Sequence, residues 1–184
     1  MGRFMNHKKW VVALALIATA LILTHLPVSE ADAAASASDF QIEGSTLTKY
    51  RGTDGRVTIP DTVEVVGESA FENNQKVQLV VVPKSVKRMD AYVFWGCDNL
   101  EEVVLGKGLT SVDEYAFSGC TGLKQITIPE NVQSIDAQAF AGCTNLTDIY
   151  IPDTVTSIAD DAFLNCDNVT IHADEGSVAE KFAQ

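Results

Sequence analysis

The chain has 184 residues, of which 46% are apolar and 21% charged, and its 13 basic and 25 acidic side chains give a formal net charge of −12. This length and apolar content are typical of a folded domain and exclude a disordered chain. The acidity disfavours nucleic acid and anionic membrane surfaces as partners, and 3 histidines with 4 cysteines leave little material for metal sites or acid–base catalysis.

Residues 1–33 have the pattern of a secretory signal peptide. A basic start containing Arg3, Lys8 and Lys9 precedes an apolar run over 10–26, and the sequences at 31–33 and 35–37 fit Ala-x-Ala cleavage sites. The alternative is an uncleaved membrane anchor, but the run is short for a membrane span. Cleavage would leave 10 basic and 23 acidic side chains on an exported chain that no longer contacts the membrane.

After a short linker at 34–38, we expect an N-terminal cap over 39–56. Two segments, 40–42 and 47–50, flank Gly44 and predict a β-hairpin that leads into the first repeat.

Residues 57–170 repeat with a period of 23, which predicts a solenoid. Several columns of residues keep this step: Phe71, Phe94, Phe117, Phe140, Phe163; Asn74, Cys97, Cys120, Cys143, Cys166; Pro60, Pro83, Pro129, Pro152, with Gly106 in the missing place; Val57, Val80, Val103, Ile126, Ile149; and Ile59, Val82, Leu105, Ile128, Ile151. Each unit is expected to contain a short strand ended by proline, a second extended piece, and a helical turn that begins at Asp90, Asp113 or Asp136 in three units. One unit is too small to fold alone, so the five repeats must stack and be capped.

The C-terminal cap is expected over 171–184. Ser177 and Glu180 have the spacing of a capping box that opens a short helix, with Val178 and Phe182 on one face.

These repeats resemble the BspA-like branch of the leucine-rich repeat family. The match is Ile-Pro-x-x-Val-x-x-Ile at 128–135 followed by Ala-Phe-x-x-Cys at 139–143, and it recurs in the flanking units. The resemblance implies an α/β repeat solenoid, a curved leucine-rich repeat array with a parallel concave β-sheet. It also implies a bacterial protein, secreted or on the cell surface, that acts as a non-enzymatic protein–protein interaction or adhesion module without cofactors. Asn74 and Gly106 depart from the pattern at positions where the backbone geometry can still be met.

The four cysteines, with Asn74, are expected to form a buried structural ladder. Exported proteins usually pair their cysteines, and the spacing of adjacent strands falls within the range of a disulfide. Side chains that point the same way must twist to reach disulfide geometry, however, so we predict free thiols that pack as small hydrophobes.

Catalytic and metal-binding arrangements are weak in this sequence. After cleavage His172 is the sole histidine, which is too few for an ordinary zinc site, and Cys166 would be its only thiol partner. The carboxylate pairs Asp160–Asp161 and Glu101–Glu102 allow a hydrolase hypothesis, but solvated faces and turn starts explain them better. We therefore predict no catalytic, metal or cofactor site.

Two sets of side chains are candidates for binding a partner. On the predicted concave sheet, an apolar stripe flanked by acids consists of Leu79, Val81, Val104, Thr127 and Tyr150, although β-branched residues also favour strands for their own sake. On the turns, Tyr92, Trp95 and Tyr115 are either exposed anchors or partly packed against the next repeat. The partner is expected to be an extracellular or cell-surface protein bound by a monomer, with a glycan bound through the aromatics as the alternative.

Overall fold

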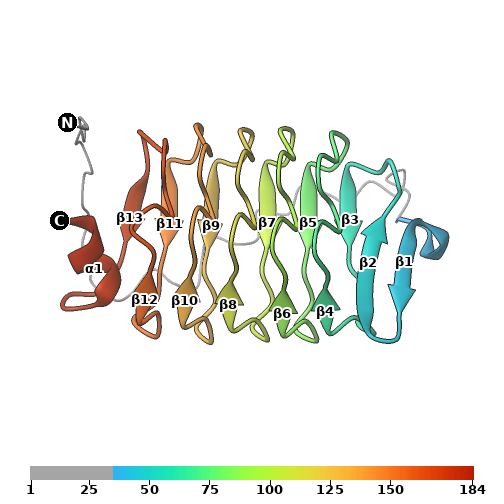
Figure 1. Ribbon diagram of the computed structural model, residues 1–184, viewed down its shortest axis with the longest axis horizontal. Coiled ribbons are helices and arrows are strands. Elements are labelled where there is room, and N and C mark those ends of the chain that lie inside the picture. The colour runs from blue at the N-terminus through green and yellow to red at the C-terminus, as the bar shows by residue number, and fades with distance from the viewer. Residues whose placement is uncertain (1–34) are drawn as a thin grey trace, which may run out of the picture.

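The computed structural model describes residues 35–184, so the signal peptide predicted over 1–33 lies outside the described residues. The chain winds as a parallel β-solenoid whose successive turns stack along the long axis (Figure 1). A 3-10 helix, η1 (Ala37–Asp39), precedes an antiparallel hairpin of β1 (Phe40–Glu43) and β2 (Thr46–Tyr50). Gly44 takes a left-handed φ of 62° between the two strands, which glycine adopts at little cost. The predicted N-terminal hairpin is confirmed.

One wall of the solenoid, here called the strand face, consists of three-residue parallel strands. They are β3 (Arg56–Thr58), β5 (Leu79–Val81), β7 (Glu102–Val104), β9 (Gln125–Thr127), β11 (Asp148–Tyr150) and β13 (Thr170–His172). The middle residue of each strand is buried and its two neighbours point outward, as the period of two in a β-strand requires. The predicted inward column is confirmed and gains a sixth member, Ile171, which pairs with Ile149 at a step of 22 rather than 23.

The second wall consists of two-residue strands. They are β4 (Val65–Val66), β6 (Arg88–Met89), β8 (Ser111–Val112), β10 (Ser134–Ile135) and β12 (Ser157–Ile158). The hairpin strand β2 pairs in parallel with β4, so this wall continues into the N-terminal cap. In Figure 1 these strands form the lower row of arrows and the strand face forms the upper row.

The remaining side, here called the turn wall, contains hydrogen-bonded turns where a helical turn was predicted in each unit. Backbone N–H groups in one turn of the solenoid, here called a rung, donate to carbonyl groups of the following rung. Examples are the bonds from Phe94 to the Ala116 carbonyl and from Phe117 to the Ala139 carbonyl, both 2.8 Å. These bonds replace the contacts within a helix. The expected capping carboxylates are used elsewhere, since Asp90 accepts from Arg88 and Asp113 from Ser111. Among described residues, the α-helical part is therefore confined to the C-terminal cap.

Aromatic rings stack along the inside of the turn wall. The five predicted phenylalanines lie with neighbouring ring centroids 5.0–5.3 Å apart. The stack continues beyond the repeats, because Tyr50 stacks on Phe71, Phe40 packs on Tyr50, and Phe182 of the C-terminal helix lies 5.9 Å from Phe163. Both caps thus cover the ends of the core with an aromatic side chain.

The unit containing Gly106 interrupts both strand walls. Within residues 35–184, β7 pairs with β5 but not with β9, and β8 pairs with β10 but not with β6. A Cβ atom at Gly106 would overlap the Pro83 carbonyl, so this segment lies closer to the preceding rung than other residues permit. Leu105, predicted to be fully inward, is only partly buried. Gly106 thus meets the backbone geometry of the repeat, as predicted, but the hydrogen bonding between neighbouring strands is interrupted at this rung.

The C-terminal helix α1 (Val178–Ala183) closes the other end of the core. The Ser177 hydroxyl accepts from the Glu180 amide at 3.1 Å, as the predicted capping box requires, but the Glu180 carboxylate bonds to the Gly176 amide instead of that of Ser177. The buried face consists of Ala179 and Ala183, with Phe182 partly buried beside them. Val178 and Phe182 lie one turn apart on the helix, as predicted, and both are half-buried, while the small residues Ala179 and Ala183 make the closest packing against the core. Residues 35–184 thus contain a core that is covered at both ends.

Candidate binding surfaces

The strand face brings together the predicted stripe. Leu79, Val81 and Val104 are half-buried neighbours on β5 and β7, while Thr127 and Tyr150 are exposed on β9 and β11. Tyr150 has 44% of its surface exposed, which is high for a large aromatic side chain. Glu102, Gln125 and Asp148 occupy the other outward positions of these strands. The result is a continuous outward surface with apolar side chains at one end and a tyrosine at the other.

His172 extends this surface beyond Tyr150. The register places the two side chains on neighbouring strands, where their rings stack at 4.3 Å with an angle of 11° between the planes. The His172 Nε2 atom lies 2.8 Å from Asp148 Oδ1, and this hydrogen bond lowers the pKa of the Asp148 carboxyl. Sequence reasoning considered His172 only with Cys166, because the step of 22 hid its register with Tyr150.

The three aromatics of the turn wall form a second surface. Tyr92 and Tyr115 stack at 4.8 Å with rings nearly parallel, at 5°, and Trp95 is 38% exposed. Both tyrosines have left-handed backbones, with φ of 59° and 56°, which is costly for a bulky residue. Ser69 and Gln138 have the same conformation in this column, so the strain comes with the repeat geometry. The two tyrosines therefore support each other across the rungs, and both are half-buried.

The cysteine column is buried and contains free thiols, as predicted. Each thiol donates to the carbonyl of the phenylalanine 26 residues earlier: Cys97 to Phe71, Cys120 to Phe94, Cys143 to Phe117 and Cys166 to Phe140, at 2.9–3.1 Å. Burial raises the pKa of the Cys97 thiol to about 12 and that of Cys120 well above its usual value. The Cys97 and Cys120 thiols are therefore poor nucleophiles at neutral pH.

Asn74 occupies the first place of this column with a different set of contacts. Its Oδ1 atom accepts from the backbone amides of Lys76 and Val77, so it closes a local turn. A side-chain amide is similarly used at Asn145, part of a glycosylation sequon, where Nδ2 donates to the Thr121 carbonyl at 2.8 Å. Asn74 thus stabilises a turn within its own rung, whereas Asn145 links two successive rungs.

The structure does not bring Cys166 and His172 together as a thiol–imidazole pair. His172 bonds to Asp148 and the Cys166 thiol bonds to the Phe140 carbonyl, so neither contact joins these two residues. Residues 35–184 contain no group of three or more His, Cys, Asp or Glu side chains placed to hold a metal ion. In the same residues no helix has the length and apolar character needed to cross a bilayer.

Comparison with known protein families shows which family these repeats match. A profile described as BspA type leucine rich repeat region matches residues 53–170 in six copies, one more than the five that the columns count. The chain is similar to a leucine rich cell surface protein of Faecalibacterium prausnitzii, with 33% identity and a TM-score of 0.70 over 75% of this chain and 37% of that protein. No curated protein matches the chain.

Two further solved structures share the fold. A leucine rich repeat protein of T. pallidum is 28% identical with a TM-score of 0.70, over 73% of this chain and 68% of that one. A leucine-rich repeat protein of Bacteroides ovatus is 29% identical with a TM-score of 0.62, over 71% and 36%. This chain therefore spans little more than a third of the length of two of these proteins.

Proposed function

Because the chain belongs to the BspA-type leucine-rich repeat family, we propose that it is an exported, non-enzymatic module that binds another protein through the strand face. It acts at the cell surface or outside the cell, as a monomer and without a cofactor. The basic start and apolar run of residues 1–33 support export, and so does the description of the F. prausnitzii relative as a cell surface protein.

The observation that carries this proposal is the contrast between inward and outward side chains of the same strands. Inward positions hold valine or isoleucine on every rung, whereas outward positions change from Leu79 and Val81 to Glu102 and then to Tyr150. A parallel sheet that served only stability would need no large exposed tyrosine. Aromatic side chains at exposed positions are frequent anchors of protein interfaces.

The charge of the chain favours a partner with a basic rim. Residues 34–184 carry 10 basic and 23 acidic side chains, and Glu102 and Asp148 lie beside the stripe. Complementary charges at the rim of an interface raise the association rate and make binding weaken as salt increases. We therefore expect an extracellular or cell-surface protein whose apolar contact area is bordered by lysine or arginine.

The test is capture from extracellular matrix and microbial surface extracts by residues 35–184 bearing defined substitutions. Val104→Lys with Tyr150→Lys should abolish capture, because it places two charges within the stripe. The matched control is Gln133→Lys with Thr144→Lys, which adds the same charge at exposed positions off the strand face. Proteins captured equally by both double variants would contradict the assignment of this face.

A glycan-binding function is the second candidate, and the stacked tyrosines favour it. Trp95, Tyr92 and Tyr115 offer aromatic faces of the kind on which sugar rings stack. Under this hypothesis Trp95→Ala removes binding to whole cells or matrix, while the double substitution on the strand face leaves it intact. Loss of binding in neither variant would exclude both surfaces, and turnover of a glycan or peptide would revive the hydrolase hypothesis.

A further inference from the structure

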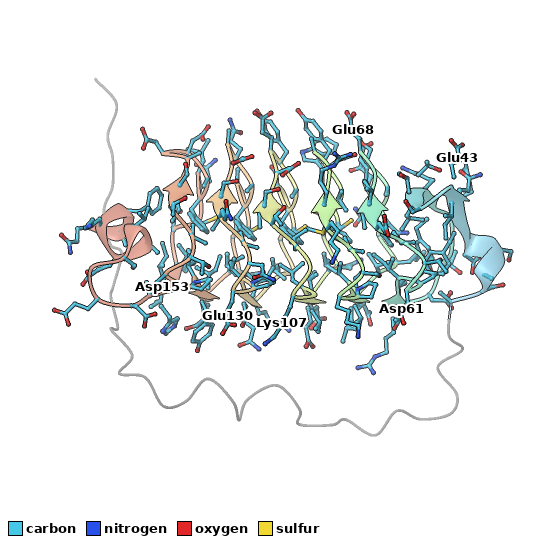
Figure 2. All side chains as sticks on the ribbon, turned by 90° about the horizontal axis from the view of Figure 1, so that it is seen from below. Glu43, Asp61, Glu68, Lys107, Glu130 and Asp153 are labelled. Atoms are coloured by element: carbon cyan, nitrogen blue, oxygen red, sulfur yellow. The ribbon has the colours of Figure 1, made fainter. Side chains whose placement is uncertain are left out.

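A shallow hollow lies at the corner that follows the strand face. Its volume is about 500 Å³, and its lining is polar: Asp61, Lys84, Ser85, Lys87, Lys107, Gly108 and Asn131. Figure 2 shows Asp61, Lys107, Glu130 and Asp153 along this edge of the solenoid, with Glu68 on the opposite edge. The hollow spans four rungs and contains none of the side chains assigned above to the strand face or to the turn-wall aromatics.

Three lysines gather here in a chain that is otherwise acidic. Lys84, Lys87 and Lys107 are exposed, and they account for three of the ten basic side chains of residues 34–184. Lys84 and Lys107 occupy the same column on adjacent rungs, where two like charges repel each other. Such an arrangement costs stability unless an anion lies between the charges.

None of these three ammonium groups forms an ion pair with the described residues. Asp61, Glu64 and Glu130 occupy neighbouring rungs of the same columns, yet the salt bridges of residues 35–184 join Arg88 to Asp90, Lys124 to Glu101 and His172 to Asp148. The lysines therefore do not serve to neutralise the acidic columns beside them.

The backbone beneath the lysines shapes the hollow. Ser85 and Gly108 share one column, and glycine leaves the place above the serine without a side chain. In the next two rungs of this column, Asn131 donates to the Lys107 carbonyl and Thr154 to the Val132 carbonyl. The Ser85 Oγ atom has no such bond, and it is the one buried side-chain oxygen of residues 35–184 without a partner. This oxygen is enclosed, so a rotation of the Ser85 side chain toward the hollow would be needed for it to donate to a ligand there.

Asp61 is the one carboxylate that lines the hollow. It lies at the end nearest Lys84, so three cations face one anion across the site. Glu64 and Glu130 lie one rung away in the same columns, and acidic groups farther along the chain are screened at physiological salt, where the Debye length is about 8 Å. The side chains that line the hollow therefore carry a net positive charge although the whole chain is negative.

We propose that this hollow binds an oxyanion, a phosphate or sulfate group, held by Lys84, Lys87 and Lys107, with the Ser85 hydroxyl as a further donor once its side chain rotates toward the ligand. Tetrahedral oxyanions match three ammonium groups because each oxygen accepts a charge-assisted hydrogen bond. The volume exceeds that of a free ion and leaves room for a sugar-sized body that carries the group.

The test is calorimetric titration of residues 35–184 with glucose 6-phosphate, inorganic phosphate and unmodified glucose. The site variant is Lys84→Gln with Lys107→Gln. Its control, Lys76→Gln with Lys124→Gln, removes the same charge at exposed positions outside the hollow. Because all four positions are exposed, thermal unfolding should show folded protein in each case.

We expect saturable binding of glucose 6-phosphate that weakens at least about tenfold in the site variant and by less than about twofold in the control, since each lost charge-assisted bond is worth about tenfold or more. Equal affinity for inorganic phosphate would identify the free ion as the source, and tighter binding of the sugar phosphate would identify the carried group. The absence of binding by either phosphate, binding of glucose with equal affinity, or equal losses in both double variants would overturn the proposal. Trp95→Ala should leave this binding unchanged.

Discussion

The turn wall and the strand face differ in how strictly they repeat. On the turn wall a phenylalanine returns at each of the five repeats and a cysteine at all but the first, where Asn74 stands. The rings are about 5 Å apart, and each thiol donates to the carbonyl of an earlier phenylalanine. On the strand face only the inward residue is constant, and the outward residues change between apolar, acidic and aromatic. Constancy belongs to the residues that stack the rungs, and variation to the residues that a partner can contact.

The turn wall and the strand walls also differ within the single unit at 102–112. Both strand walls lose their pairing there, while the turn wall continues through it, since the Tyr92 amide bonds to the Glu114 carbonyl and the Gly96 amide to the Ser118 carbonyl. The turn wall alone therefore connects the two halves of the solenoid by an unbroken ladder. Substitutions in it should cost more than substitutions in the strand face.

The largest effect is expected from Phe117→Ala. Phe117 is fully buried between Phe94 and Phe140, so its removal leaves a cavity in the middle of the ring stack. The free energy of unfolding should fall by about 3–5 kcal/mol in urea titration. Phe117→Leu, which keeps most of the volume, should lose clearly less, and a loss below about 1 kcal/mol for the alanine variant would contradict the role given to the turn wall.

Replacing Gly106 should destabilise the chain even when it restores the repeat. Both Gly106→Ala and Gly106→Pro place a Cβ against the Pro83 carbonyl, so each should cost about 1–3 kcal/mol by overpacking. Urea titration of the two variants measures this. An increase in stability with proline would show that the interruption at this rung is not set by the close approach of the backbone.

Alkaline pH should weaken the cysteine ladder. Burial raises the pKa of the Cys97 thiol from 9.0 to about 12, so above pH 9 the unfolded chain releases a proton that the folded chain keeps. Stability is thus fully present below pH 9 and falls as pH rises toward 12, by about 1.4 kcal/mol per pH unit for this group. Unfolding free energies at pH 8 and 10 should differ less in Cys97→Ala, and equal differences in both proteins would refute the linkage.

Much of the fold was predictable because residues that are 23 positions apart occupy equivalent places in successive stacked rungs. The columns identified the phenylalanine stack, the free thiols and the inward valines. What they missed lies where the spacing changes: Ile171 follows a step of 22, and Tyr50 and Phe182 join the ring stack from the caps. Periodicity cannot detect a contact made outside the period.

The surfaces were predictable only in part. Alternation along the strands placed Val104 and Tyr150 outward, but the contact of His172 with Tyr150 depended on the shortened last unit. The lysine hollow could not be predicted from the sequence, because the missing hydrogen-bond partner of Ser85 and the close packing of Gly108 on the Lys84 and Val86 carbonyls depend on how the rungs stack. A column of the repeat predicts which side chains lie along the same edge of the solenoid. It does not predict which of their polar atoms lack a hydrogen-bond partner.

The smallest effect on stability, and the most direct test of the account, comes from Val104→Lys with Tyr150→Lys. Both side chains point outward, so the free energy of unfolding should change by about 1 kcal/mol or less, and a partner captured by the wild-type chain should bind at least about tenfold more weakly in an interferometry titration. Unchanged affinity in this folded variant would contradict binding through the strand face.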